Sequence, residues 1–199
     1  MTTNQDLVNK LLGIWNIVND WLKYADSKNA VMLAFYGAII TGIVSCLSSE
    51  FTIPKSLTFG LIVSIVLFSI SIILNLVAFL PKTDSDKYFW NLLQRSKNIN
   101  PNPDRDNFYF YGDLRKYSDI SNRIPSPDKL IEAINNAYSF NLTTPFPKEA
   151  RDICLQIIIN SDITFKKFEL ANFSIRLAFI ALLLIPLSMI FSLILFHHL

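Results

Sequence analysis

The residues best suited to bind a ligand lie in one stretch of aromatic and basic side chains between positions 105 and 123. An aromatic ring can stack on a nucleobase, and an arginine guanidinium can donate two parallel hydrogen bonds to a phosphate. The candidate ligand-binding residues are Arg105, Tyr109, Tyr111, Asp113, Arg115 and Lys116. The same composition also fits an aromatic core surrounded by solvated charges, so the pattern leaves both interpretations open.

Motifs for catalysis are absent from the sequence. It has no Gly-rich phosphate loop, no H-E-x-x-H pair, no CxxC pair and no nucleophile elbow. We therefore expect no enzymatic activity and no cofactor. The adjacent His197 and His198 cannot easily face one ion from a helix, so we expect no metal site. Cys46 and Cys154 are expected to be small packing residues.

Apolar runs dominate the chain and indicate a membrane protein. Residues 30–49 and 57–80 carry no charge, and at about 1.5 Å per residue each helix is long enough to cross a hydrocarbon core of roughly 30 Å. A third run, 173–196, has one charge near its start, Arg176, whose side chain can reach the lipid headgroups. Hydrophobic residues make up 51% of the 199-residue chain, which is high for a soluble domain. We expect three transmembrane helices.

Basic residues near the ends of these runs predict the orientation in the membrane. Those on one side are Lys23, Lys28, Lys82, Lys87, Lys166 and Lys167, whereas the loop on the other side has Lys55 alone. Because cytoplasmic loops carry the excess of Lys and Arg, we expect the N-terminus and residues 82–172 in the cytoplasm. The net charge of +2 gives no indication of nucleic-acid binding.

The expected fold class is an all-α membrane protein in which three transmembrane helices are joined to long helices of a cytoplasmic helical domain. An amphipathic helix with apolar residues between Leu7 and Leu22 precedes the first span, and its apolar face packs either on lipid or, as we slightly favour, on protein. No Pro or Gly interrupts residues 15–36, which favours one continuous helix. The expected parts are a cytoplasmic amphipathic helix (1–29), a transmembrane hairpin (30–81), a cytoplasmic helical domain (82–172), and a third span with a short external tail (173–199).

Within the cytoplasmic domain, the sequence predicts helices at 84–96, 129–140 and 148–170, the last continuing into the third span. Residues 98–127 are rich in Pro, Asn and Asp and predict a packed but mostly irregular element.

Two faces in the hairpin predict contacts between helices. Small residues fall four apart at Ala30, Ala34, Ala38 and Gly42, which lets another helix approach closely. That helix is either the second span or a helix of another subunit. Ser64, Ser71 and Asn75 share one face of the second span and either hydrogen-bond to a neighbouring helix or line a water-filled path in an oligomer.

Several short segments occur in a characteristic order. They are Tyr24-Ala25-Asp26-Ser27-Lys28, Phe79-Leu80-Pro81-Lys82, Phe108-Tyr109-Phe110-Tyr111-Gly112-Asp113, Gln156-Ile157 and Lys166-Lys167. The first is similar to the D-x-K signature of the Pycsar effector family of bacterial membrane proteins, and the chain resembles that family over residues 20–195. The family usually has Ala after the Lys, where this chain has Asn29.

The resemblance implies an effector of bacterial anti-phage defence in the inner membrane. Such effectors respond to cyclic UMP or cyclic CMP made by a partner cyclase and impair the membrane, which fits a homo-oligomer that the ligand switches between two states. Asp26 and Lys28 are expected at the cytoplasmic membrane interface as a surface pair, which can lie between adjacent helices. The alternative is a constitutive membrane scaffold or adaptor that holds a protein partner with its cytoplasmic helices.

Overall fold

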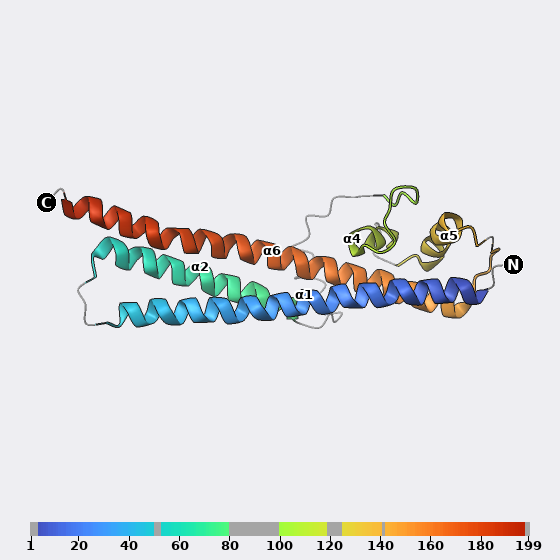
Figure 1. The fold of residues 1–199 in the computed structure, drawn as a ribbon, viewed down its shortest axis with the longest axis horizontal. Helices are drawn as coiled ribbons and strands as arrows, with labels where there is room; N and C mark the ends of the chain where they lie inside the picture. The colour runs from blue at the N-terminus through green and yellow to red at the C-terminus, as the bar shows by residue number, and fades with distance from the viewer. Residues whose placement is uncertain (1–3, 50–52, 80–99, 119–124, 141, 198–199) are drawn as a thin grey trace. The chain divides into compact units, whose positions relative to one another are not determined.

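The structure is a computed structural model that describes residues 4–49, 53–79, 100–118, 125–140 and 142–197, with side chains described as far as residue 194. Within these ranges the regular elements are helices, apart from one isolated antiparallel bridge between Ser118 and Pro125. The expected all-α fold class with three candidate membrane spans is confirmed. The helix expected at 84–96 lies outside the described residues. Figure 1 labels the helices and colours them from blue at the N-terminus to red at the C-terminus.

Two of the helices are much longer than a membrane is thick. Helix α1 (Asn4–Leu47) joins the amphipathic segment to the first apolar run without interruption, as expected. Helix α6 (Lys148–His197) likewise continues into the third run and passes through Pro186. Helix α2 (Lys55–Phe79) forms the second span. A proline is tolerated inside a membrane helix when neighbouring groups satisfy the backbone that it frees.

The chain divides into two compact units. Unit 1 comprises Met1–Ala25 and Pro81–Lys166, and unit 2 comprises Asp26–Leu80 and Lys167–Leu199. Helices α1 and α6 are therefore each divided between the two units, with one part in unit 1 and the other part in unit 2.

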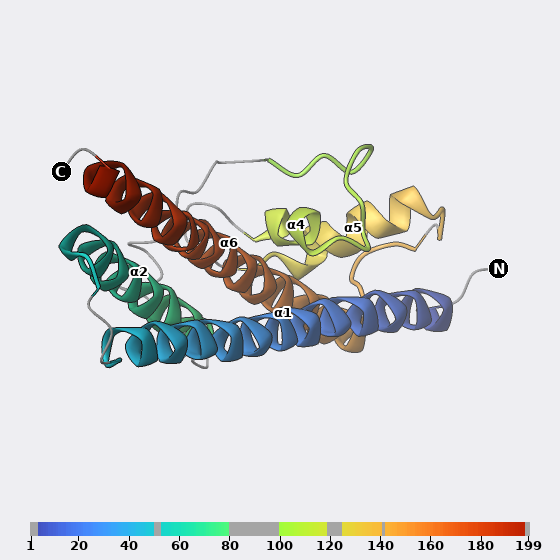
Figure 2. The same ribbon diagram turned by 60° about the vertical axis from the view of Figure 1, so that its left-hand side comes forward.

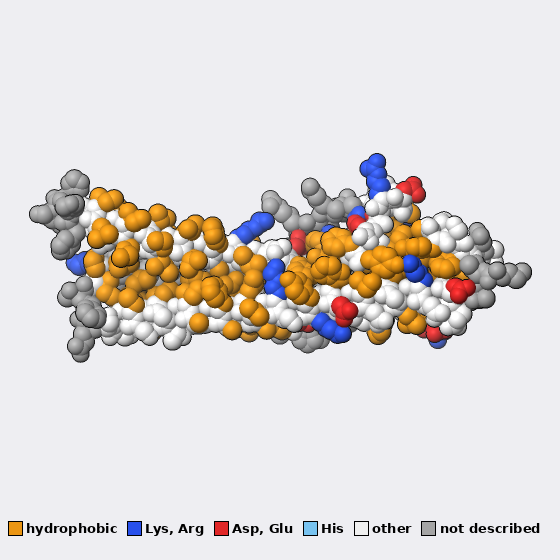
Figure 3. Space-filling view, in the orientation of Figure 1, with side chains coloured by type: hydrophobic (Ala, Val, Ile, Leu, Met, Phe, Trp, Pro, Cys, Tyr) orange, Lys and Arg blue, Asp and Glu red, His pale blue; other side chains and the backbone are white. Residues whose placement is uncertain are grey.

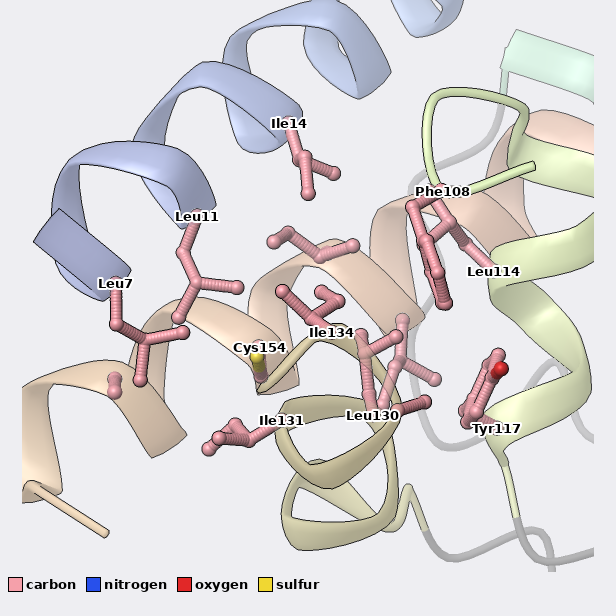
Figure 4. Packing of buried hydrophobic residues seen from close by; sticks show 14 of the residues in the cluster. Leu7, Leu11, Ile14, Phe108, Leu114, Tyr117, Leu130, Ile131, Ile134 and Cys154 are labelled. Carbon is pink, nitrogen blue, oxygen red and sulfur yellow. The ribbon is translucent and has the colours of Figure 1, made fainter. Parts of the chain in front are cut away.

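The core of unit 1 is formed by the amphipathic part of α1, helix α5 (Pro127–Ala137) and the first part of α6. Leu7, Leu11 and Ile14 lie on one face of α1 and are fully buried. They point toward Ile134 of α5 and Cys154 of α6 (Figure 4). The prediction that this face packs on protein rather than on lipid is confirmed.

Residues 100–118 form the compact, mostly irregular element that the sequence predicts. It consists of turns followed by two short helices, α4 (Tyr111–Leu114) and η2 (Arg115–Tyr117). Phe108, Leu114 and Tyr117 are buried in the core of unit 1. Figure 2, which turns the view by 60°, shows α4 and α5 on the same side of the first part of α6.

The core of unit 2 is formed by α1, α2 and α6, and polar side chains of α2 bond across it. The Ser64 hydroxyl donates to the backbone oxygen of Ala181 at 3.0 Å, and the Asn75 amide donates to the Ser174 hydroxyl at 2.5 Å. Ser71 donates to the backbone oxygen of Ser174 at 3.2 Å. Of the two expectations for this face, hydrogen bonding to a neighbouring helix is confirmed.

Helices α2 and α6 approach closely at Gly60. A Cβ atom placed there would lie 2.4 Å from both the Cβ and the Oγ of Ser188, and 3.7 Å from the backbone oxygen of Leu184. Real Cβ atoms do not approach other atoms so closely, so this crossing requires glycine.

The small-residue face of α1 does not pack on the second span. Ala30, Ala34, Ala38 and Gly42 are all exposed, and a Cβ atom at Gly42 would meet no atom within 4 Å. The expectation of packing within the chain is therefore wrong, because the buried face of α1 in unit 2 is the one that carries Tyr36 and Ile43. Packing between subunits stays a prediction.

The outward surface of unit 2 is apolar. Val31 of α1, Phe59 of α2 and Leu193 of α6 are 70%, 71% and 63% exposed. Figure 3 shows hydrophobic side chains covering much of this face over α2 and α6. A surface of this kind is stable in lipid rather than in water.

The two cysteines differ in burial. Cys154 is buried, as a packing residue should be, whereas Cys46 is exposed. The prediction of a packing role is therefore wrong for Cys46 within the chain.

Candidate functional site

An aromatic–arginine cluster joins four helical elements of unit 1. It consists of Trp21 on α1, Phe110 and Tyr111 at the start of α4, Arg115 on η2, and Phe165 on α6. The Arg115 guanidinium carbon lies 3.2 Å from the centroid of the Phe165 ring. The Tyr111 ring lies 4.6 Å from Phe110, 5.5 Å from Trp21 and 6.5 Å from Phe165 between centroids. Tyr111 is thus at the centre of the cluster.

The cluster presents aromatic surface to solvent next to a fixed positive charge. Trp21 is 36% exposed and Phe110 is 40% exposed, whereas Tyr111 is partly buried. Burial raises the pKa of the Tyr111 hydroxyl, so this side chain is neutral at physiological pH. Stacking on Phe165 orients the planar guanidinium of Arg115. This combination can stack a planar heterocycle and pair with an anion.

A second group brings Lys10, Tyr109 and Tyr138 together. The Lys10 ammonium lies 3.9 Å from the centroid of the Tyr138 ring and 5.0 Å from that of Tyr109, and it donates to the Tyr109 hydroxyl. This hydrogen bond lowers the pKa of Tyr109, although burial opposes the shift. The contacts tie the loop before α4 to the N-terminal part of α1.

A third group is a network of ion pairs centred on Lys116. Burial disfavours the charged form of Lys116, but hydrogen bonds to Asp106 and Asp113 outweigh burial and raise the pKa of its ammonium. The Lys116 nitrogen lies 2.7 Å from an oxygen of Asp106 and 2.6 Å from one of Asp113. Asp106 also accepts from the hydroxyl of Tyr117 at 3.3 Å. The network holds the turns at 102–117 in one conformation.

The structure therefore distributes the candidate ligand-binding residues over different surroundings. Tyr111 and Arg115 meet in the aromatic–arginine cluster, and Asp113 and Lys116 pair with each other. Tyr109 contacts Lys10 instead. Arg105 is exposed on a turn that precedes Tyr109 in the chain.

Trp21 and Phe165 are site residues that the sequence did not identify. Trp21 lies in the predicted amphipathic helix and Phe165 in the helix predicted at 148–170, but neither is near residue 111 in sequence. Only the long-range packing of α1, α4 and α6 brings them together. Lys10 and Tyr138 were missed for the same reason.

Asp26 and Lys28, expected at the membrane interface, each contact α6 within unit 2. The Asp26 carboxylate is hydrogen-bonded to the Lys167 ammonium, with side-chain exposures of 39% and 12%. The Lys28 ammonium lies 5.6 Å from the centroid of the Phe168 ring. Asp26 thus pairs with a lysine of α6, Lys167.

These features define a membrane protein with three spanning helices and a separate helical unit that carries an aromatic–arginine cluster. Residues 10–195 match the profile of the Pycsar effector protein domain, PycTM, which covers nearly the whole chain. The chain belongs to the Pycsar effector family, and this membership identifies it as a membrane effector of anti-phage defence. Comparisons with curated proteins and with solved structures return no match.

Proposed function

We propose that this effector senses cyclic UMP or cyclic CMP through the aromatic–arginine cluster of unit 1 and responds by impairing the bacterial inner membrane as a homo-oligomer. The observation that carries this proposal is the match to the Pycsar effector domain over residues 10–195 together with three helices able to span a membrane. Pycsar effectors are activated by cyclic pyrimidine nucleotides, and no catalytic step is needed for such a response.

The chemistry of the cluster suits such a ligand. A pyrimidine base is planar and can stack on the partly exposed rings around Tyr111, while the cyclic phosphate carries one negative charge that Arg115 can pair with. Arg105 and Lys116 lie on the same irregular segment, and they are proposed to contribute positive potential rather than direct contacts. Lys116 is held by two carboxylates, those of Asp106 and Asp113.

The proposed orientation is supported by the lysines near the ends of the spans. Lys23 and Lys28 lie before the first span, and Lys166 and Lys167 lie before the third. We place these residues, the N-terminus and unit 1 on the cytoplasmic side, where a cyclic nucleotide made inside the cell reaches the cluster.

The proposed output is a change of packing among the spanning helices. Helices α1 and α6 each run from the cluster into unit 2 as one element, through Trp21 and Phe165 respectively. A ligand that binds one arrangement of these helices more tightly shifts the population toward it. The exposed small-residue face of α1 is the surface that we propose meets another copy.

Calorimetry on the purified full chain tests the sensing step. We expect cyclic UMP or cyclic CMP to bind. Arg115→Ala should weaken binding by roughly 10- to 150-fold, because a hydrogen bond to a charged group contributes about 1.5–3 kcal/mol. Arg151→Ala is the matched control, because Arg151 pairs with Asp128 elsewhere in unit 1. It should bind the nucleotide as the wild type does.

Two results would count against the proposal. Equal affinity of the two arginine variants would remove Arg115 from the site. Absence of binding to every cyclic mononucleotide, with a protein partner that co-purifies regardless of nucleotide, would instead favour the scaffold alternative.

A further inference from the structure

Unit 2 contains a line of buried polar groups that the proposed function does not explain. Asn29 on α1, Ser71 and Asn75 on α2, and Ser174 on α6 are all fully buried. Groups of this kind are costly in an apolar surrounding unless they are hydrogen-bonded. The partners of each group therefore show which helix arrangement the sequence favours.

Around Ser174 the polar groups hydrogen-bond to one another, although the Asn75 Oδ1 atom lacks a partner. The Asn75 amide nitrogen donates to the Ser174 hydroxyl at 2.5 Å and to the backbone oxygen of Ser71 at 3.0 Å. The Ser174 hydroxyl lies 3.0 Å from the backbone oxygen of Ser71 and 3.4 Å from the hydroxyl of Tyr36. This network joins α1, α2 and α6 and stabilises the packing described here.

Asn29 is different, because neither its Nδ2 nor its Oδ1 atom has a hydrogen-bond partner, although the residue is fully buried. In the described part of unit 2, Asn29 is the one residue whose polar side-chain atoms are all buried without a hydrogen-bond partner. Asn75, by comparison, lacks a partner only at its Oδ1 atom. Asn29 lies on the face of α1 that also carries buried Ala25 and Tyr36. Removing a buried amide from water without replacing its hydrogen bonds destabilises that packing.

We infer that Asn29 is a positioning residue that sets the activation threshold of the effector, by destabilising the resting helix packing relative to an alternative packing in which its amide is hydrogen-bonded. This inference rests on the proposed ligand-driven repacking and adds the residue that tunes it. Helix α1 carries Trp21 of the cluster and Asn29 without a break, so a shift of α1 that the ligand favours also moves Asn29. Ser174 acts in the opposite sense, because its bonds stabilise the resting packing.

Two substitutions separate these roles. Asn29→Leu keeps the number and branching of the side-chain heavy atoms and removes the amide, so it should raise the unfolding temperature of the ligand-free protein in detergent. In vesicles containing the protein, it should raise the concentration of cyclic pyrimidine nucleotide for half-maximal dye leakage by about tenfold or more. Ser174→Ala is the matched control and should lower both values. If Asn29→Leu fails to insert, Asn29→Ala is measured with the same expectation for leakage.

The inference is overturned if Asn29→Leu lowers the unfolding temperature, or if it leaves the nucleotide dependence of leakage unchanged. A complete loss of leakage with retained nucleotide binding supports it, since the threshold then exceeds the tested range. Failure of the proposed function gives a different result, in which the wild-type protein itself shows no nucleotide-dependent leakage.

Discussion

Substitution of Gly60 by alanine tests the packing of the spanning helices most sharply. The new Cβ atom would lie 2.4 Å from the Cβ and Oγ atoms of Ser188. The Ser188 Cβ is fixed to the backbone of α6, so the helices themselves must move apart. Overpacking of this kind costs about 1–3 kcal/mol. Alanine also favours the helix over glycine by about 0.8–1 kcal/mol, which partly hides the cost.

Gly42→Ala provides the matched control, because a Cβ atom at Gly42 meets nothing within 4 Å. Both variants gain the same helix propensity, so the difference between them isolates the clash. We expect Gly60→Ala to be less stable than Gly42→Ala by about 1–3 kcal/mol in SDS-driven unfolding from mixed micelles. Ser188→Gly removes the side chain that the new Cβ atom would meet. In the double variant Gly60→Ala/Ser188→Gly the stability difference should disappear, which corresponds to a coupling energy between the two substitutions of about 1–3 kcal/mol.

The reasoning is refuted if Gly60→Ala is as stable as Gly42→Ala, or if Ser188→Gly does not rescue it. Either result would mean that α2 and α6 do not cross at these residues. A loss of self-association in Gly42→Ala, without a loss of stability, would separately support contact between subunits through the small-residue face of α1.

Three further predictions concern charge, pH and thiol reactivity. Asp26→Asn leaves the mostly buried Lys167 ammonium without its carboxylate and should lower stability by about 1–2 kcal/mol, whereas Asp20→Asn, in an exposed pair, should change it by less than about 0.5 kcal/mol. Burial, and to a lesser degree Asp106, raises the pKa of Tyr117 above that of an unfolded tyrosine. Above about pH 10 the unfolded state therefore loses this proton first, and stability falls by up to about 1.4 kcal/mol per pH unit. Tyr117→Phe should reduce that slope in alkaline unfolding titrations, and an unchanged slope would contradict the prediction. Burial also raises the pKa of the Cys154 thiol, so in a Cys46→Ser background maleimide should label the chain only on unfolding, and rapid labelling of the folded protein would contradict the buried position.

The spans and the long helices could be predicted from sequence because their signals are local. An uncharged apolar run is continuous along the chain, and the spacing of Leu7, Leu11 and Ile14 marks one helix face. The hydrogen bonds of Ser64, Ser71 and Asn75 to a neighbouring helix followed from the same logic, because polar groups in hydrocarbon need partners.

Contacts between distant segments could not be predicted in this way. Spacing shows that Ala30 and Ala34 share a face, but it does not show whether that face meets a helix or lipid, and the structure leaves it exposed. The aromatic cluster depends on Trp21 and Phe165 meeting Tyr111 across the fold. Likewise, Asn29 was noticed only as a departure from the family pattern, and its buried amide without partners is visible only in three dimensions.

Dye release from sealed vesicles made with the purified full chain tests the central claim most directly. The account predicts that cyclic UMP or cyclic CMP triggers release, that cyclic AMP and linear UMP do not, and that Arg115→Ala requires more of the cyclic nucleotide for the same release. Release that is the same with and without nucleotide, or intact vesicles when calorimetry shows the cyclic nucleotide bound, would contradict a ligand-gated effect on the membrane.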